Sequence, residues 1–482
     1  MRVLEQLEPK NVLSFFEDLC AIPHGSGNTK AISDYCVKFA ESRGLEVHQD
    51  GLNNVVIVKP AAPGYEAAPT VIIQGHLDMV AEKAPESPIN FLTDGLDLAV
   101  DGDFIRAKGT TLGGDDGIAV AMALAVLDAK DLSHPRLECL FTIDEETGMD
   151  GAVGFDASIL QGKRLLNIDS EEEGILTVSC AGGAHAAVRI PMTANECALD
   201  SAEIRISGLK GGHSGAEIDK GRANATITLG RVLQALVDEL EVRLVSAEGG
   251  LKDNAIPNAA RAVIALEDGK LPRAQEICAE LQDTFRREYA AADPDVTVTF
   301  TPGTVASQAL TLRDTKKVCC FLGLYPNGIE SMSMDIPGLV QTSCNLGIFK
   351  VNGSGLEGSG SVRSSIASRK QLLLRRIGLL AEGLDGTLCV SGEYPAWEYR
   401  RESHLRDVMC KVYKDQYGQD MKVEAIHAGL ECGLFCGKIP GLDAVSFGPN
   451  LYDIHTVKEH MSISSVQRVY AYLCAVLQAL KD

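Results

Sequence analysis

The chain has 482 residues, of which 45% are hydrophobic and 23% carry a charge, and its formal net charge is −21. This length exceeds what one hydrophobic core usually organises, so we expect at least two domains. The negative charge argues against nucleic acid and anionic membrane surfaces as partners, because both are bound through basic faces.

The composition also bears on the compartment. The 14 cysteines include no CxxC pair. The first residues lack a basic segment followed by an apolar one, and no apolar run is long enough to cross a bilayer. We therefore expect reduced thiols and a cytoplasmic protein.

The N-terminal part alternates helical and extended patterns. Apolar spacing predicts a helix that begins at Pro9 and a second helix that Gly44 ends. Short apolar runs predict strands at 55–58 and 71–74. His24 lies in the loop between the two helices, and we do not expect it to be a ligand. The alternation predicts an α/β layered domain.

The strand at 71–74 runs into Gly75, His76, Leu77 and Asp78. Side chains alternate along a strand, so His76 and Asp78 share one side where it ends. Binding sites in open α/β sheets lie at the carboxyl ends of strands. A neutral imidazole binds metal, and a nearby carboxylate can orient it. Taken alone, a His-x-Asp at a strand end is more often an ordinary polar turn.

A glycine-rich loop at 108–117 contains Asp115 and Asp116 and precedes an apolar helix at 118–127. Glycines around two acids allow a close approach of the backbone. The alternative is a flexible loop whose acids favour the positive end of the helix dipole. Phosphate binding is disfavoured, because the loop has two carboxylates and no lysine beside them.

Two more apolar strands end in acids. The strand at 137–143 runs into Asp144, Glu145 and Glu146, and the strand at 165–168 runs into Asp169. Each segment alone could be a solvated turn, since clustered acids repel unless solvent or a cation compensates. Three strands that end in His, Asp or Glu, with the Gly-Gly-Asp-Asp loop between two of them, instead predict a hydrolytic metal site at one sheet edge.

The pattern changes near residue 187. Elements follow in the order βαββαβ, typical of a ferredoxin-like unit, with strands near 202–209, 242–247, 261–266 and 296–300 and helices near 223–240 and 272–291. A loop with Gly211, Gly212 and His213 follows the first strand. A second set of helices and strands up to about 390 repeats the theme, so we expect two related halves.

The α/β pattern returns after residue 390, with a strand that runs into a loop at 423–433, a loop near 452–461 and a closing helix at 464–480. We therefore predict a discontinuous catalytic domain (1–186 and 391–482) with a mixed sheet flanked by helices. An inserted α+β domain (187–390) interrupts it.

The ordered motifs resemble those of the M20 family of metallopeptidases. They are GHLDMV at 75–80, GGDDG at 113–117, DEETG at 144–148, NIDSEEEG at 167–174, GGHSG at 211–215 and IHTVKEH at 454–460. The segments HSGAEIDKGRANA, MSMDIPGLVQTSCNLG and HAGLECGLF resemble its Xaa-His dipeptidase branch more narrowly. The resemblance covers essentially the whole chain. It implies a dinuclear enzyme that hydrolyses unblocked dipeptides, notably Xaa-His dipeptides such as β-alanyl-histidine.

The resemblance also implies roles for individual residues. The implied metal ligands are His76, Asp115, Glu146, Asp169 and His455, with Asp115 bridging two ions and joined to Asp116 by a cis peptide bond. The implied catalytic residues are Asp78, which orients His76, the general base Glu145, and His213, which stabilises the oxyanion. The implied substrate contacts are Asn254, Arg363, Gly429 and Glu431.

The coordination and acid–base properties of these side chains are consistent with the implied roles. Two metals can share a hydroxide and polarise a carbonyl, and a carboxylate has two oxygens with which to bridge them. Adjacent Glu145 and Glu146 point different ways from extended backbone, so one can ligate while the other takes the water's proton. His213 would need domain closure to reach the substrate. We prefer His455 to His460 as ligand, because it fits the family's His-x-x-x-Glu spacing with Glu459.

Other functions and assemblies remain open. One alternative is a related aminopeptidase or an N-acyl amino acid amidohydrolase. Another is a catalytically dead metal-binding protein, but such a protein would not need Glu145. Nitrogen and oxygen donors without thiolate suit Zn, Mn or Co, of which we expect Zn. We expect a homodimer through the inserted domain, although two halves in one chain could supply what a partner supplies elsewhere.

Overall fold

The computed structural model describes residues 2–481 and divides into two compact units. The first unit comprises Met1–Ser179, Tyr399–Ala425 and Leu430–Asp482, and the second comprises Cys180–Glu398 and Ile426–Gly429. No helix within residues 2–481 is both long and apolar enough to cross a bilayer.

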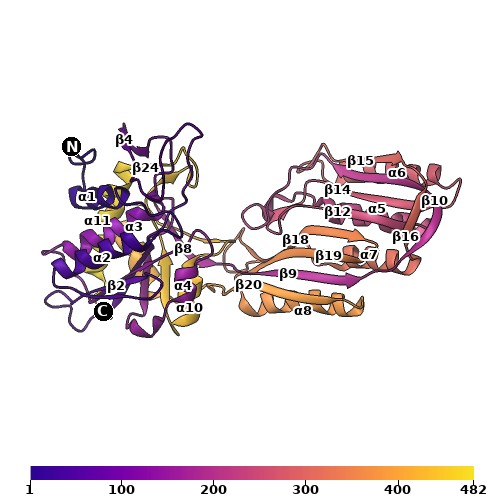
Figure 1. Ribbon diagram of the computed structural model, residues 1–482. Helices are drawn as coiled ribbons and strands as arrows, with labels where there is room; N and C mark the ends of the chain where they lie inside the picture. The colour runs from indigo at the N-terminus through magenta and orange to yellow at the C-terminus, as the bar shows by residue number, and fades with distance from the viewer. Residues whose placement is uncertain (1, 482) are drawn as a thin grey trace. The chain divides into compact units, whose positions relative to one another are not determined.

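An eight-stranded mixed sheet forms the centre of the first unit (Figure 1). Its strand order is β1-β2-β6-β3-β7-β22-β8-β21. Strand β3 pairs in parallel with β6 and β7, and β7 pairs in parallel with β22. The carboxyl ends of these strands therefore meet at one sheet edge. The bounds are Glu46–Gln49 (β1), Val55–Lys59 (β2), Val71–His76 (β3), Leu137–Thr142 (β6), Arg164–Asn167 (β7), Ile175–Cys180 (β8), Lys422–Ile426 (β21) and Asp443–Ser446 (β22).

Helices cover this sheet, which explains the uninterrupted apolar runs of its central strands. All residues of β3 and β6 are buried. Helix α3 contacts β3 and α1, α2 contacts β2, and α9 and α10 contact β22. Helix α3 is buried around nearly its whole circumference, as its apolar sequence predicts. The helix bounds are Lys10–Cys20 (α1), Lys30–Ser42 (α2), Gly114–Asp128 (α3), Asp150–Gly154 (α4), His404–Tyr417 (α9), Glu431–Lys438 (α10) and Ile463–Ala479 (α11).

A small four-stranded sheet in the same unit has the order β23-β24-β5-β4. Its strands are Leu98–Asp101 (β4), Phe104–Ala107 (β5), Leu451–Tyr452 (β23) and His460–Ser462 (β24). The loop between β23 and β24 carries His455 and Glu459. Pairing of β24 with β5 thus anchors a C-terminal loop to the N-terminal part of the chain.

The second unit contains a ten-stranded sheet made of two ferredoxin-like units. In the first, β10-α5-β12-β14-α6-β15 gives the strand order β15-β10-β14-β12, and in the second, β9-α7-β18-β19-α8-β20 gives β18-β19-β9-β20. Antiparallel pairing of β12 with β18 joins the halves. Figure 1 shows the strands in this order, from β15 at the upper edge to β20 at the lower.

One continuous hydrophobic core lies between this sheet and helices α5 to α8. The strand bounds are Gly182–Pro191 (β9), Ala194–Ser207 (β10), Arg243–Gly249 (β12), Ala260–Leu266 (β14), Thr297–Pro302 (β15), Val340–Asn352 (β18), Gly355–Ser364 (β19) and Thr387–Tyr394 (β20). The helix bounds are Ala225–Glu239 (α5), Leu271–Glu288 (α6), Leu312–Leu324 (α7) and Ala367–Gly383 (α8). Shorter strands are Gly212–His213 (β11), Ala255–Ile256 (β13), Ala306–Leu310 (β16) and Gly328–Met332 (β17).

The sequence-based boundaries at 186/187 and 390/391 fall inside strands β9 and β20. These two strands pair with each other in the second sheet, so both belong to the second unit. Strand β9 is the first strand of the second half, and the whole first half is inserted after it. The sequence analysis did not identify β9 as a strand of that half.

Candidate metal centre and active site

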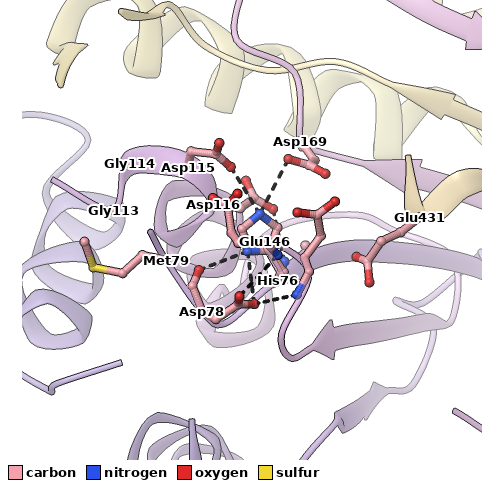
Figure 2. Close-up of polar contacts among 12 residues, drawn as sticks. His76, Asp78, Met79, Gly113, Gly114, Asp115, Asp116, Glu146, Asp169 and Glu431 are labelled. Carbon is pink, nitrogen blue, oxygen red and sulfur yellow. Dashed lines mark hydrogen bonds and ion pairs between the residues drawn. The ribbon is translucent and has the colours of Figure 1, made fainter. Parts of the chain in front are cut away.

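The parallel strands β3, β6 and β7 bring the residues that follow them to one place. Figure 2 shows the carboxylates of Asp115 and Asp169 directed toward the imidazole of His76. His76 Nε2 lies 3.1 Å from Asp115 Oδ1 and 3.7 Å from Asp169 Oδ1. His76 is almost fully buried, whereas the carboxylates of Asp115 and Asp169 are partly accessible. The predicted convergence at this sheet edge is therefore present.

Asp115 stands between two imidazoles. Its Oδ1 faces His76, while its Oδ2 lies 3.2 Å from His455 Nε2. His455 Nε2 also lies 3.0 Å from Glu146 Oε1. The two carboxylate oxygens of Asp115 thus belong to two different clusters. One contains His76 and Asp169, and the other contains His455 and Glu146.

These distances fit divalent cations. Nitrogen and oxygen ligands bound to one tetrahedral ion at about 2.1 Å lie about 3.4 Å from one another. Here the donor atoms around Asp115 are separated by 3.0 to 3.7 Å. The ligand atoms of His76, Asp115 and Glu146 also lie within 4.8 Å of one another, as do those of His76, Asp116 and Asp169. The donors are hard oxygens and imidazole nitrogens, which suit Zn, Mn or Co.

Asp116 is an additional buried acid that the sequence analysis did not assign as a ligand. The peptide bond between Asp115 and Asp116 is cis, as expected from the family resemblance. Asp116 Oδ2 accepts the backbone N–H of His76 at 3.1 Å. Asp115 and Asp116 therefore direct their carboxylates to different parts of His76, one to the ring and one to the backbone.

The acids of this site shift the pKa values of the groups around them. Burial opposes ionisation of Asp115, but hydrogen bonds from His455 and His76 outweigh it and hold the pKa of this carboxyl below its usual range. Hydrogen bonds to Asp115 and Glu146 raise the pKa of His455 to about 10. Burial raises the pKa of Asp169 well above its usual value, and the neighbouring Asp116 adds to the effect. The nitrogens that attract protons here are the atoms that would bind a cation.

Asp78 holds several parts of the site together. The N–H groups of Glu145 and Glu146 donate to its Oδ1 and Oδ2 at 3.0 and 3.4 Å, and the hydroxyl of Ser26 donates to Oδ2 at 2.8 Å. His76 Nδ1 lies 3.0 Å from the backbone oxygen of Asp78 and 3.5 Å from its Oδ1. With its proton held on Nδ1, His76 can offer the lone pair of Nε2 to a cation between it and the acids.

Glu145 has the surroundings of a general base. Burial is the largest cause that raises the pKa of its carboxyl to about 8, and Glu431, Glu146 and Asp115 raise it further against the opposing effect of His76. A carboxyl that changes protonation near neutral pH can accept a proton and then release it. The hydrogen bond from the backbone N–H of Glu145 to Asp78 fixes the position of the Glu145 backbone.

Glu431 differs from its predicted role as a substrate contact. Its side chain is fully buried, and its Oε2 accepts hydrogen bonds from Gln74 Nε2 at 2.5 Å and from Thr142 Oγ1 at 2.8 Å. Burial raises the pKa of its carboxyl to about 7. The sequence suggested a loop here, but Glu431 is the first residue of α10. The inward direction of this residue could not be read from local sequence.

The alternative histidine, His460, lies apart from these acids. Its ring stacks on Tyr452 with centroids 5.0 Å apart and meets Phe104 edge to face. Its Nδ1 lies 2.9 Å from the backbone oxygen of Lys458. The structure therefore brings His455, and not His460, to Asp115. His24, which we did not expect to ligate, is buried, with Nδ1 2.6 Å from the backbone oxygen of Ile22.

His213 lies in the second unit, on β11. Its Nδ1 accepts the N–H groups of Gly215 and Ala216 at 3.3 and 3.0 Å, so the ring carries its proton on Nε2. Burial and the nearby Arg363 lower the pKa of His213, which favours the neutral ring. Neutral His213 thus presents one Nε2–H donor.

Arg363 adjoins His213 in the same unit. A Cβ atom at Gly215 would lie 3.0 Å from His213 Cε1 and 3.1 Å from Arg363 Nε. Arg363 donates to the hydroxyl of Tyr394 at 3.0 Å, and its Nε has no hydrogen-bond partner within residues 2–481. A Cβ at Gly429 would meet the Tyr394 ring at 2.9 Å, so Gly429 lies against this group.

Asn254 is the fourth predicted substrate contact. This residue is exposed, and its backbone oxygen accepts the N–H of Ser214 at 2.9 Å. Two residues of this region were not identified from the sequence: Tyr394, which holds Arg363, and Ser343, whose hydroxyl lies 2.7 Å from His427 Nε2. Each contact joins residues far apart in sequence, 31 residues for Tyr394 and Arg363 and 84 residues for Ser343 and His427.

Known proteins match this chain over its full length. Residues 72–479 match the peptidase family M20/M25/M40. The cytosol non-specific dipeptidase of Escherichia coli (strain K12) is 34% identical over 482 residues, which are 100% of this chain and 99% of that protein.

Solved structures of peptidases are also similar to this chain. The aminoacylhistidine dipeptidase from Vibrio alginolyticus is similar with a TM-score of 0.95 at 35% identity, covering 99% of this chain and 98% of that chain. The aminopeptidase PepT from Bacillus cereus shares the fold, with a TM-score of 0.56 at 15% identity, over 99% of this chain and 100% of that chain. The chain is thus a peptide hydrolase that belongs to peptidase family M20/M25/M40.

Proposed function

We propose that the protein is a dinuclear metal-dependent dipeptidase that hydrolyses unblocked dipeptides, notably Xaa-His dipeptides such as β-alanyl-histidine. One observation carries the dinuclear part: the two oxygens of Asp115 face two different imidazoles, His76 and His455. Full-length similarity to proteins named cytosol non-specific dipeptidase and aminoacylhistidine dipeptidase supports the substrate class.

The ligand sets follow from the two clusters. His76 and Asp169 would hold one divalent ion, His455 and Glu146 would hold the other, and Asp115 would bridge them. Zn is the ion we expect first, with Mn and Co as alternatives. When bound, such a pair of ions lowers the pKa of water and polarises the scissile carbonyl.

Glu145 takes the proton of the attacking water and passes it to the leaving amine. The burial that raises its pKa to about 8 supports this role, because the acid can hold the proton between the two transfers. Asp78 keeps the backbone of Glu145 and Glu146 in place, so that Glu146 ligates while Glu145 remains free for the water.

The second unit supplies groups for the substrate. The Nε2–H of His213 suits a developing oxyanion, an interaction whose removal costs about 3–4 kcal/mol in other enzymes. The guanidinium of Arg363 suits a carboxylate, since its Nε is free to donate. Contacts from Asn254 and Gly429 stay predictions.

Location and assembly also stay predictions. The cytosol in the name of the Escherichia coli relative supports a cytoplasmic location. We still predict that the inserted domain acts as a lid and forms a homodimer.

The mechanistic test replaces Glu145 by glutamine in the full chain. We expect kcat/KM to fall about 10²- to 10⁴-fold, because a general base is lost, while the bound metal stays at two ions per chain. Glu172→Gln is the matched control, since Glu172 is an exposed acid in the neighbouring acidic run. Unchanged turnover in the Glu145 variant would mean that another group is the base.

The substrate test uses chelator-treated protein with Zn, Mn or Co added back. We expect metal-dependent cleavage of β-alanyl-histidine and of a leucyl dipeptide, but not of a tripeptide or an N-acetyl amino acid. Cleavage of the acetylated compound would favour the amidohydrolase alternative. Two bound ions without any cleavage would favour a binding protein with an inactive site.

A further inference from the structure

A buried carboxylate that the proposed mechanism does not use contacts the backbone just before Asp115. Glu459 is only 3% exposed, and its Oε2 accepts the N–H groups of Leu112 and Gly113 at 2.7 and 3.1 Å. Its Oε1 accepts the N–H of Gly114 at 2.8 Å. Both oxygens are therefore occupied by the backbone of the loop that ends in Asp115.

These N–H groups belong to the first residue of α3 and the two residues before it, and they have no partners within that helix. A buried N–H without an acceptor costs about 1–3 kcal/mol, so three of them would not stay together without such a carboxylate. Hydrogen bonds to an ionised acceptor are also stronger than those between neutral groups. Glu459 thus fixes the backbone conformation of residues 112–114.

The glycines of this loop fit the same arrangement. A Cβ at Gly114 would lie 3.3 Å from Glu459 Oε1 and 3.0 Å from Leu451 Cδ2. Gly113 has φ +66°, a left-handed conformation that side chains rarely adopt. The glycines therefore let the backbone approach the carboxylate closely, which adds a physical reason for the Gly-Gly pair before Asp115.

Glu459 also connects two loops that carry proposed metal ligands. It lies 347 residues after Leu112 in the sequence but only four residues after His455. The contact therefore ties the loop of His455 to the loop of Asp115. It binds backbone N–H groups of that loop and not the carboxylate of Asp115, so both oxygens of Asp115 are left to face the two imidazoles.

We infer that Glu459 is a positioning residue, which holds the 112–115 loop so that the two oxygens of Asp115 stand between His76 and His455. The inference rests on the proposed function, in which Asp115 bridges two ions. Glu459 would thus influence metal affinity although it is not one of the proposed metal ligands. Supporting groups of this kind typically change metal affinity 10- to 100-fold.

Glu138 provides a matched control in the same unit. It is 1% exposed, and its carboxylate accepts the N–H groups of Gln161 and Gly162 at 3.0 to 3.1 Å. The loop that it holds carries no proposed ligand. Replacing either glutamate by glutamine should therefore disturb a buried backbone clamp, and at Glu138 also an ion pair with Arg136, but only the clamp of Glu459 supports Asp115.

The test measures Zn affinity of the chelator-treated full chain by competition with a chelating dye, and the melting temperature of the same metal-free samples. We expect Glu459→Gln to raise the dissociation constant of at least one ion about 10-fold or more, and Glu138→Gln to leave both constants within about twofold. Both variants should lower the melting temperature of the metal-free protein.

Two results would overturn the inference. One is wild-type Zn affinity in folded Glu459→Gln, and the other is an equal loss of affinity in both variants, which would indicate a general effect of instability. If Glu459→Gln does not fold, Gly114→Ala perturbs the same contact with the carboxylate retained, and unchanged affinity there would also contradict us. A wild-type chain that binds fewer than two ions would instead contradict the proposed metal centre itself.

Discussion

Replacing the buried acid Glu431 by glutamine should stabilise the metal-free protein in a pH-dependent way. The folded structure raises the pKa of this carboxyl from 4.5 to about 7 through burial. Because the folded state holds the proton more tightly than the unfolded state, stability falls as the pH rises from about 4.5 to about 7. Above that range the loss is constant, and below it the loss disappears.

The shift sets the expected size of the effect. A difference of about 2.5 pKa units, at about 1.4 kcal/mol per unit, corresponds to about 3 kcal/mol at pH 8. At pH 5 the same calculation leaves less than about 1 kcal/mol. Glutamine retains the oxygen that accepts hydrogen bonds from Gln74 and Thr142, so the comparison isolates the charge.

The assay is urea unfolding of chelator-treated protein, followed by circular dichroism at pH 5 and pH 8. We expect Glu431→Gln to be more stable than the wild type at pH 8 by about 3 kcal/mol and nearly equal at pH 5. Glu172→Gln, which removes an exposed charge, should show no such difference between the two pH values. A stability change that is the same at both pH values would refute the reasoning.

Two further predictions concern the ligands and the substrate. Zn affinity should rise with pH between 6 and 9, because the imidazole of His455, with a pKa of about 10, must lose its proton before it can ligate. His455→Ala should weaken this dependence, and an affinity that does not vary with pH would contradict it. Tyr394→Phe removes one hydrogen bond to Arg363 and should raise KM about 2- to 10-fold with little change in kcat, measured by steady-state kinetics.

The parts of the site that the sequence predicts correctly depend on local patterns. The strand expected at 71–74 is present as β3, and the strand expected at 137–143 is present as β6. Apolar runs determine where such strands lie, and the polar residue after each run marks its end. Since parallel strands end at the same edge, the convergence of His76, Glu146 and Asp169 follows without knowledge of side-chain detail.

The parts that the sequence did not predict depend on distant contacts. Strand β9 forms the second ferredoxin-like half only by pairing with β19 and β20, which follow it by well over a hundred residues. Four of its six buried positions are glycine or alanine, so the apolar signal of its first half is weak. Glu431 was misread for a related reason: its direction depends on Gln74 and Thr142, which belong to other strands.

The acids at the candidate metal centre form two groups, which differ in what their oxygens contact. Because each group has a different role, the site contains more acids than the proposed ions need as ligands. Asp115, Glu146 and Asp169 direct their oxygens to imidazole nitrogens, where cations would bind. Asp78 and Glu459 accept backbone N–H groups of the loops that carry those ligands. A neutral acceptor could fill the second role, but it would hold the N–H groups less strongly. Asp78 and Glu459 also add negative charge near the proposed cation sites. They should therefore increase cation affinity electrostatically, in addition to holding the loops that carry the ligands.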